Sequence, residues 1–289
     1  MKHNVVFRLD FSGKYGYGHL TRCITILENL KTNKVNFFFI ILSSDFNNEF
    51  LKIIKHHKIY KLKYDSNNYH QNLRKDLIFT SKVLKQINNP IVIVDSYKIN
   101  QYWSKYISNF SKKLILFNDV IQSKIYCDIL IDQTFNRKSS EYKNYIIKKT
   151  LIFAGHQYAL LRNQFSANLF HRKNQRNILI SMGGTDPKKI TSKIIKLVLE
   201  VFKNDPVIIL LNKSSIQIPI LKKKYNSLLL RKKITILSDI YNIMPIYQKT
   251  SFCIGTGGVS ALERCKIGIP SLVYQAAKNQ SNIIYNMKK

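Results

Sequence analysis

Short runs of β-branched and aromatic residues alternate with longer segments of helical periodicity along this chain of 289 residues. That alternation is typical of repeated strand, helix, strand units, which build a parallel sheet covered by helices. Strands are expected at residues 5–10, 35–42, 59–63, 91–95, 113–117, 128–131, 177–182, 207–212, 234–237, 251–254 and 271–274. Helices are expected, among others, at residues 20–31, 46–57, 70–86, 188–202, 240–248, 259–267 and 280–287. The pattern predicts an α/β fold.

The strand pattern starts again after about residue 172, beside the polar stretch 171–176, which has the composition of a linker. A complete set of strands and helices lies on either side of it. The sequence therefore predicts two doubly wound, Rossmann-like domains, residues 1–170 and 171–289, that face one another across a cleft.

The formal net charge is +31, from 47 Lys and Arg against 16 Asp and Glu. Such a charge raises nucleic acid as a partner, because basic side chains neutralise phosphates. However, 47 − 9 Arg leaves 38 Lys spread along the whole chain, which indicates compositional bias and no clustered basic stripe. No nucleic-acid partner is expected. The arginines are more informative, because a Lys-biased chain keeps guanidinium where a planar, permanent charge is needed.

The four cysteines, Cys23, Cys127, Cys253 and Cys265, are too far apart for the C-x-x-C spacing of metal or redox sites. A reduced, cytoplasmic protein is expected, with most of these residues in the core. A catalytic thiol at Cys23 is the less favoured alternative. The N-terminus has no charged-then-apolar leader, and no apolar run reaches the length of a membrane span.

A glycine loop after the first predicted strand carries a candidate base. The strand ends in Asp10, and Gly16 and Gly18 precede His19 at the start of a helix. Because the helix dipole disfavours an imidazolium there, His19 is expected to be neutral and available as a base; the alternative is a capping or packing histidine. Thr21 stands where the dinucleotide fingerprint has its third glycine, so no nicotinamide cofactor is expected.

Polar residues also follow the fourth and fifth predicted strands, where parallel sheets bind their ligands. Asp95 and Tyr97 lie at the end of the fourth strand, and Asn118 and Asp119 follow the fifth. Such groups can hold sugar hydroxyls or orient a histidine, although each alone is more typical of a helix cap. The segment 155–165, with two aromatic residues and a rare arginine, is either part of the site or a plain connector.

The second half has two glycine loops, each between a strand and a helix. One is Gly183-Gly184-Thr185 and the other contains Gly257 and Gly258. Backbone N–H groups and helix dipoles converge there, so the loops are expected to bind a pyrophosphate, and with no acidic cluster in the chain no metal is called for. Neither is a Walker loop. Glu263 can accept from both ribose hydroxyls, or it is a solvated helix charge.

These segments occur together as Phe7-Arg8-x-Asp10, Gly16-x-Gly18-His19-x-x-Arg22-Cys23, Asp128-Ile129-Leu130-Ile131-Asp132-Gln133, Gly155-x-x-Tyr158-Ala159-Leu160-Leu161-Arg162-x-x-Phe165, Met182-Gly183-Gly184-Thr185-Asp186 and Gly257-Gly258-x-x-x-x-Glu263-Arg264-Cys265-x-x-Gly268-x-Pro270-Ser271. The set resembles the UDP-2,4-diacetamido-2,4,6-trideoxy-β-L-altropyranose hydrolase family of pseudaminic acid biosynthesis over nearly the whole chain. The resemblance implies the two-domain GT-B architecture, similar to that of the lipid II-forming N-acetylglucosaminyltransferases, with water as the acceptor.

The resemblance also implies residue roles. His19 matches the general base that activates water for inverting displacement at the anomeric carbon, and Glu263 matches the uridine-nucleotide-binding glutamate. UDP and the free 2,4-diacetamido sugar would be released, with Tyr97 and Tyr158 lining the sugar side. The full set of expected substrate-binding residues is Gly18, Arg22, Asp95, Tyr97, Tyr158, Gly183, Gly184, Thr185, Lys189, Gly257, Gly258, Glu263, Asn279 and Gln280.

Three features depart from the family pattern. Asn118 stands where an Asp-Asp pair is usual, and Lys189 where an Asn is common. The chain ends nine residues after Gln280, so a terminal element at the cleft is expected to be missing. A GT-B glycosyltransferase that uses a UDP-sugar donor is the alternative function, and a non-enzymatic nucleotide-sugar or polyanion-binding protein is the third. The oligomeric state stays open.

Overall fold

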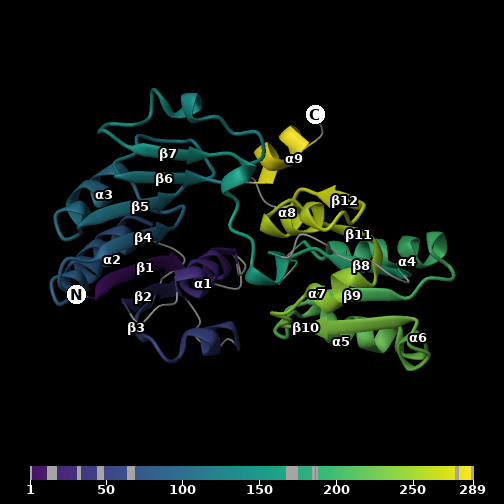
Figure 1. Ribbon diagram of the computed structural model, residues 1–289. Helices are drawn as coiled ribbons and strands as arrows, with labels where there is room; N and C mark the ends of the chain where they lie inside the picture. The colour runs from purple at the N-terminus through teal and green to yellow at the C-terminus, as the bar shows by residue number, and fades with distance from the viewer. Residues whose placement is uncertain are drawn as a thin grey trace. The chain divides into compact units, whose positions relative to one another are not determined.

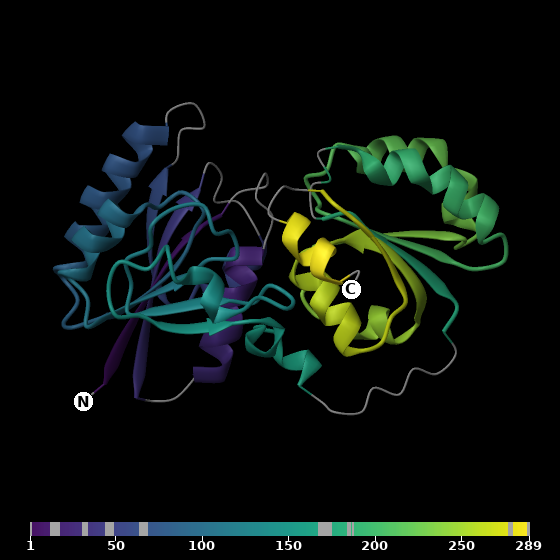
Figure 2. The same cartoon turned by 90° about the horizontal axis from the view of Figure 1, so that it is seen from above.

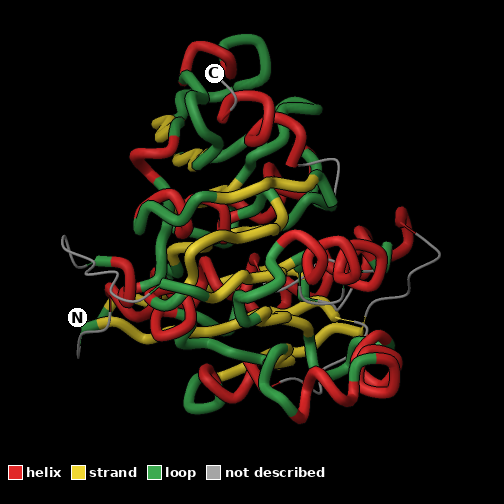
Figure 3. The backbone as a smooth tube through the Cα atoms, turned by 90° about the vertical axis from the view of Figure 1, so that its right-hand side faces the viewer, coloured by secondary structure: helices red, strands yellow, loops and turns green. Residues whose placement is uncertain are grey.

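The computed structural model describes residues 2–11, 18–30, 34–43, 49–63, 69–166, 175–183, 186, 188–276 and 280–287. The chain divides into two compact units, Met1–Leu160 and Leu161–Lys289. Each unit contains one parallel sheet, and helices follow most of its strands along the chain. This is the predicted α/β fold with two Rossmann-like parts. Figure 3 shows the helices in red and the strands in yellow. The predicted boundary between residues 170 and 171 falls in the segment 167–174, which lies outside the described residues, and it stays a prediction.

The sheet of the first unit contains seven parallel strands in the order β3-β2-β1-β4-β5-β6-β7 (Figure 1). Their bounds are β1 His3–Asp10, β2 Val35–Ser43, β3 Lys58–Lys63, β4 Ile91–Asp95, β5 Lys113–Phe117, β6 Ile129–Asp132 and β7 Leu151–Ala154. The first six were predicted within one or two residues. The seventh, a four-residue strand that pairs with β6, was not predicted.

Helices cover both faces of this sheet. Helix α1, Gly18–Leu30, lies on one face, and α2, Tyr69–Leu84, on the other, where α3, Gln101–Ser108, contacts α2 (Figure 2). Helix α3, which the periodicity did not reveal, begins after Asn100, whose side chain accepts a hydrogen bond from the Trp103 N–H at 2.9 Å. The predicted helix 46–57 is a 3-10 turn, Glu49–Ile54, within its described part.

The two faces have different cores because successive strand residues point to opposite sides. Val6 packs with Val83 and Trp103 under α2 and α3. Phe7, one residue later, stacks on Phe39 at a centroid distance of 5.1 Å on the opposite face. Arg8 returns to the α2 side, where it is buried with its charge paired to carboxylates.

The sheet of the second unit contains five parallel strands in the order β10-β9-β8-β11-β12. They are β8 Asn177–Ser181, β9 Val207–Leu211, β10 Ile234–Ser238, β11 Thr250–Thr256 and β12 Ser271–Tyr274, all predicted with small differences at their ends. The helices are α4 Ile190–Val201, α5 Gln217–Lys224, α6 Asn226–Leu230, α7 Met244–Gln248, α8 Val259–Lys266 and α9 Ser281–Met287. Helix α7 begins four residues later than predicted, next to Pro245, a residue favoured in the first helical turn.

Two apolar clusters enclose the second sheet. Ile180 packs with Ile195 of α4 and Leu221 of α5 on one face. Leu179 packs with Phe165 and Tyr247 on the other. The short segment after Leu160 thus joins the core of the second unit. None of the helices in the described ranges is long and apolar enough to cross a membrane.

The buried pairing of Arg8 generates a stability prediction. Its guanidinium donates to Asp76 Oδ2 and to Asp10 Oδ1, each at 2.8 Å, and all three side chains are buried. Arg8→Met leaves two buried carboxylates without their cation, so we expect the free energy of unfolding of the first unit to fall by about 3–5 kcal/mol. Urea unfolding followed by the fluorescence of Trp103, the single, fully buried tryptophan, measures it.

The matched control is Lys113→Met. Lys113 is exposed and lies 3.8 Å from Asp128, so its loss should change the free energy of unfolding by less than about 1 kcal/mol. Equal effects of the two variants would contradict a stabilising role for the buried pairs.

Candidate functional site

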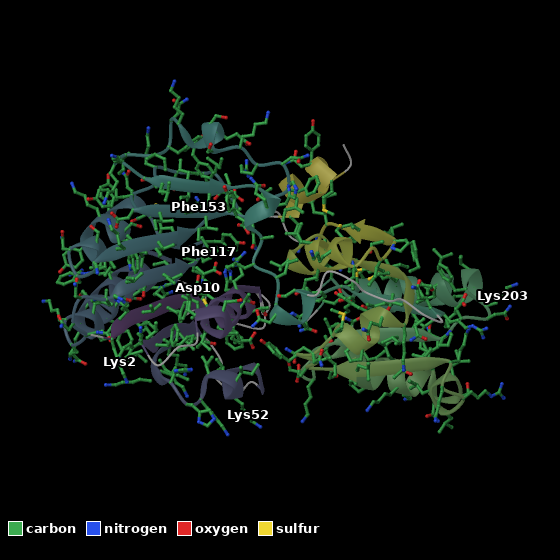
Figure 4. The ribbon with its side chains drawn as sticks, viewed as in Figure 1. Lys2, Asp10, Lys52, Phe117, Phe153 and Lys203 are labelled. Carbon is green, nitrogen blue, oxygen red and sulfur yellow. The ribbon has the colours of Figure 1, made fainter. Side chains whose placement is uncertain are left out.

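The strand order of the first unit gathers polar residues at one edge of the sheet. Asp95 is the last residue of β4 and pairs with Leu9 of β1 on one side and Phe117 of β5 on the other. Figure 4 labels Asp10 and Phe117, which end β1 and β5 at this same edge. The chain leaves β1 toward β2 on one side while β4 lies on the other, which is a topological switch point where open α/β sheets bind ligands.

His19, Arg22 and Asp95 form one buried cluster there. The His19 Nδ1 lies 2.5 Å from Asp95 Oδ1. Arg22 donates from Nε to Asp95 Oδ2 and from Nη2 to Asp95 Oδ1, both at 2.6 Å. His19 and Arg22 lie one turn apart on α1, so the start of this helix is tied to the end of β4. Asp95 is therefore no helix cap but the common partner of a histidine and an arginine.

This geometry selects a tautomer for His19. Since Asp95 already accepts two hydrogen bonds from Arg22, its short contact to Nδ1 requires Nδ1–H to donate to it. In the neutral form of the ring Nε2 then carries the lone pair, and no described residue donates a hydrogen bond to Nε2, because Arg22 Nη2 lies 3.0 Å from Nδ1 instead. Burial alone would raise the pKa of Asp95, but the charge of Arg22 and the hydrogen bonds from His19 and Arg22 hold that pKa well below its ordinary value. Asp95 thus stays ionised and orients the ring.

Asp119 extends the cluster to Tyr97. Its Oδ2 accepts from the Tyr97 hydroxyl at 2.9 Å and lies 3.4 Å from Arg22 Nη1. The Tyr97 ring meets the His19 ring edge-on at a centroid distance of 4.9 Å and is 40% exposed. Desolvation and the charge of Asp119 raise the pKa of Tyr97, so its phenol stays protonated and donates. Tyr97 is thereby fixed beside His19 with its ring open to solvent.

A nucleophilic cysteine does not belong to this cluster. Cys23 is fully buried beside Arg22, and burial raises the pKa of its thiol well above the ordinary value. A protonated, inaccessible thiol is a core residue. Cys127 and Cys253 are buried as well, whereas Cys265 is exposed.

The second unit has its own switch point, between β8 and β11. Glu263, on α8 behind the β11 loop, is buried, and its two carboxylate oxygens accept from Arg162 Nε and Nη2, both at 2.8 Å. Arg162 also donates to the Tyr241 carbonyl at 2.5 Å. This bidentate pair compensates the charge of Glu263, which is no solvated helix charge, and leaves one further lone pair on each oxygen.

The two glycine loops of this unit differ, although the sequence predicted equivalent roles for them. The carboxylate of Asp186 accepts from the backbone N–H groups of Ile190 and Thr191 at 3.0 and 2.8 Å, so a side chain already caps α4. Gly258 begins α8 without a side-chain cap. Among the described residues, a side chain therefore caps α4 but none caps α8. That both loops bind an anion stays a prediction.

The C-terminal helix α9 determines why position 257 is glycine. A Cβ at Gly257 would lie 2.6 Å from Ile284 Cγ1 and 3.3 Å from Val273 Cγ1. At Gly258, by contrast, the nearest atom would be Gln280 Nε2 at 3.9 Å. Gln280 itself accepts from the Ala276 N–H at 2.9 Å through Oε1. Gly257 is needed for packing, whereas Gly258 and Gln280 border an open side of the loop.

Other predicted substrate-binding residues lie at accessible positions. A Cβ at Gly18 or at Gly183 would meet nothing within 4 Å. Lys189 is exposed with φ +52°, and the Tyr158 ring, 41% exposed, packs on Phe153 at 5.1 Å. Gly184, Thr185 and Asn279 lie outside the described residues.

Three residues of these clusters were not predicted as site residues. Asp119 follows β5 at the correct edge, but the sequence does not tell a site carboxylate from a cap there. Arg162 and Arg264 belong to the scarce arginines of a Lys-rich chain, and that scarcity was the available signal. The partners of Asp119 and Arg162 could not be named from the sequence because Arg22 and Glu263 come from distant segments.

The depressed pKa of Asp95 gives a pH prediction. A group whose folded pKa lies below its unfolded value of about 3.9 contributes stability above that pH and loses it as the pH falls further. We expect Asp95→Asn to destabilise the first unit at neutral pH by about 3–5 kcal/mol. The difference from the wild type should shrink below about pH 4 in urea unfolding followed by Trp103 fluorescence. A difference that stays constant across this range would contradict the depressed pKa.

The unequal glycines give a second prediction. Gly257→Ala forces a methyl group against Ile284 and should lower the free energy of unfolding of the second unit by about 1–3 kcal/mol. Gly258→Ala, the matched control, meets no such contact and should lower it by no more than about 1 kcal/mol, through the poorer N-cap preference of alanine. Thermal unfolding followed by circular dichroism measures both, and a larger loss for Gly258→Ala would show that α9 does not cover position 257.

No protein-family model matches the chain. It is 29% identical over 279 residues to an uncharacterized protein, MJ1062, of Methanocaldococcus jannaschii, covering 91% of this chain and 54% of that protein, so the chain spans about half the length of this relative. It is 26% identical over 249 residues to the UDP-2,4-diacetamido-2,4,6-trideoxy-beta-L-altropyranose hydrolase of Campylobacter jejuni, covering 86% of this chain and 82% of that enzyme. The resemblance read from the motifs thus extends to a distant overall similarity.

Solved structures resemble the chain in fold. MurG of Acinetobacter baumannii superposes with a TM-score of 0.62 at 12% identity, covering 100% of this chain and 83% of MurG. TcCGT1 in complex with UDP superposes with a TM-score of 0.67 at 10% identity, covering 100% of this chain and 84% of TcCGT1. These similarities confirm the predicted GT-B-like architecture of two Rossmann-like domains.

Proposed function

We propose that this protein hydrolyses a UDP-linked 2,4-diacetamido-2,4,6-trideoxyhexose at the anomeric C1–O bond, with inversion. The products are UDP and the free sugar, an intermediate of pseudaminic acid biosynthesis for cell-surface or flagellar glycans. The observation that carries the proposal is the Nδ1 contact of His19 to Asp95, which leaves Nε2 as a proton acceptor. The named Campylobacter relative, at 26% identity, supports this substrate class.

In the proposed reaction His19 acts on water. Nε2 takes a proton from a water molecule whose oxygen attacks C1, while the C1–O bond breaks and its electron pair leaves with the β-phosphate of UDP. The imidazolium that forms is stabilised by Asp95, which already accepts from Nδ1–H. Arg22 keeps Asp95 ionised and in place, so it is a positioning residue.

The proposal assigns roles to residues of the second unit and to Tyr97 as well. Glu263, held by Arg162, accepts the two ribose hydroxyls through its remaining lone pairs. The loop at Gly258 binds the diphosphate, and the side chain of Gln280 lies beside this loop and contacts the same ligand. The exposed ring of Tyr97 contacts the sugar, for which a flat, partly apolar surface is suited.

A GT-B glycosyltransferase that transfers the sugar from UDP to another acceptor is the alternative, in keeping with the fold of MurG and TcCGT1. Both functions use the same donor. They differ in whether UDP is released when water is the only acceptor.

The test is incubation with UDP-2,4-diacetamido-2,4,6-trideoxy-β-L-altropyranose in ¹⁸O-labelled water without any acceptor. We expect UDP release with the label on the sugar C1 hydroxyl and none on UDP, because C1–O and not P–O cleaves. His19→Ala should lower kcat by at least about 100-fold, the usual contribution of a general base. UDP affinity should not change.

His56→Ala is the matched control, since His56 is an exposed histidine of the same unit. It should keep the wild-type rate. Label on the UDP phosphate, or full activity of His19→Ala, would refute the mechanism. A wild type that releases UDP only after an acceptor is added would support the glycosyltransferase.

A further inference from the structure

Arg264 is a buried arginine without a carboxylate partner. Its side chain is 0% exposed, and it forms no ion pair with any described residue. Nε donates to Ser271 Oγ at 3.1 Å and Nη2 to the Thr256 carbonyl at 3.0 Å, whereas Nη1 has no hydrogen-bond acceptor among the described residues. Buried arginines are nearly always paired, because an isolated charge in the interior is costly.

The groups around Arg264 do not neutralise it. Glu263, the preceding residue, is engaged by Arg162, so these three buried side chains carry two positive charges and one negative charge. Burial raises the pKa of both the Tyr247 phenol and the Cys253 thiol above their ordinary values despite the nearby Arg264 charge, and both stay neutral. One positive charge therefore remains without a counter-charge.

That charge lies directly under the second glycine loop. A Cβ at Gly255, in the last residues of β11, would lie 3.0 Å from both Arg264 Nη1 and the Ser181 carbonyl oxygen, so a side chain here would crowd the guanidinium. The bond from Nη2 to Thr256 O ties the same group to the loop. The loop ends at Gly258, where α8 begins without a side-chain cap. A buried cation and an uncapped helix N-terminus thus meet at one loop.

We propose that Arg264 is the fixed counter-charge for the diphosphate of a nucleoside diphosphate bound at the loop between β11 and α8. The identity of the nucleotide as UDP rests on the proposed function, whereas the anion site does not. Arg264 is buried and acts through the loop and its electric field, so it is a positioning residue. In the poorly screened interior its charge attracts the diphosphate strongly and the uncharged nucleoside not at all.

The experiment compares UDP, uridine and inorganic pyrophosphate as ligands of the full chain, measured by calorimetry or by ligand-detected NMR. Arg264→Met should raise the dissociation constants of UDP and pyrophosphate by at least about tenfold, which is ~1.4 kcal/mol. The dissociation constant of uridine should stay within about threefold of the wild-type value. Arg264→Lys, which keeps the charge and changes the hydrogen bonds, should retain most UDP affinity. A merely structural arginine would instead give similar losses for all three ligands in both variants.

Arg137→Met is the matched control. Arg137 is also buried, but it is paired with Asp132 and Glu141, both at 2.6 Å, in the first unit. It should lower stability without changing the affinity ratio of UDP to uridine. If Arg264→Met does not fold, Arg264→Gln serves as the uncharged variant. Its affinities for UDP, pyrophosphate and uridine are then compared with those of the charged variant Arg264→Lys.

The outcomes separate this inference from the proposed function. Wild-type binding of UDP that Arg264→Met leaves unchanged overturns the inference and keeps the function. Binding of pyrophosphate that depends on Arg264, without binding of UDP, supports the anion site and overturns the UDP-sugar substrate. A wild type that binds neither ligand overturns both.

Discussion

The ion pair of Arg22 with Asp95 holds the polar edge of the first sheet together. A carboxylate at the end of a buried strand must be compensated, and Arg22 does this with two hydrogen bonds of 2.6 Å. The position of Asp95 then determines the tautomer of His19, and Asp119, which also faces Arg22, fixes Tyr97 beside the histidine. Arg22 is thus the group that lies against Asp95, His19 and Asp119 alike.

The second unit contains one buried arginine that is paired with a carboxylate and one that is not. Arg162 neutralises Glu263 within the protein, whereas Arg264 has no anionic partner among the described residues. Asp186 likewise caps α4, while no side chain among the described residues caps α8, which Gly258 precedes. Completed pairs rigidify a site, and the uncompensated cation and N–H groups are what a negatively charged ligand would complete. Both proposals place the anion at the loop where these groups meet.

Most of the fold followed from local pattern. Buried parallel strands such as residues 91–95 are short β-branched runs between polar segments, which alternation identifies without knowledge of the partner strand. Several short elements were not predicted, among them β7, with four residues, and α3, with eight. The segment at residues 46–57 has helical composition, but its described part forms a 3-10 turn.

The sequence by itself determined the alternating strands and helices, the glycine loops at their ends, and which scarce residues stand there, because these depend on neighbours along the chain. Only the tertiary structure decided the pairs. His19 and Asp95 are 76 residues apart, and Arg162 and Glu263 are 101 apart. Such contacts depend on strand order and register, which bring the ends of β1 and β4 together although β2 and β3 intervene in the sequence. No local propensity encodes that adjacency, so the chemistry of each residue was predictable while its partner was not.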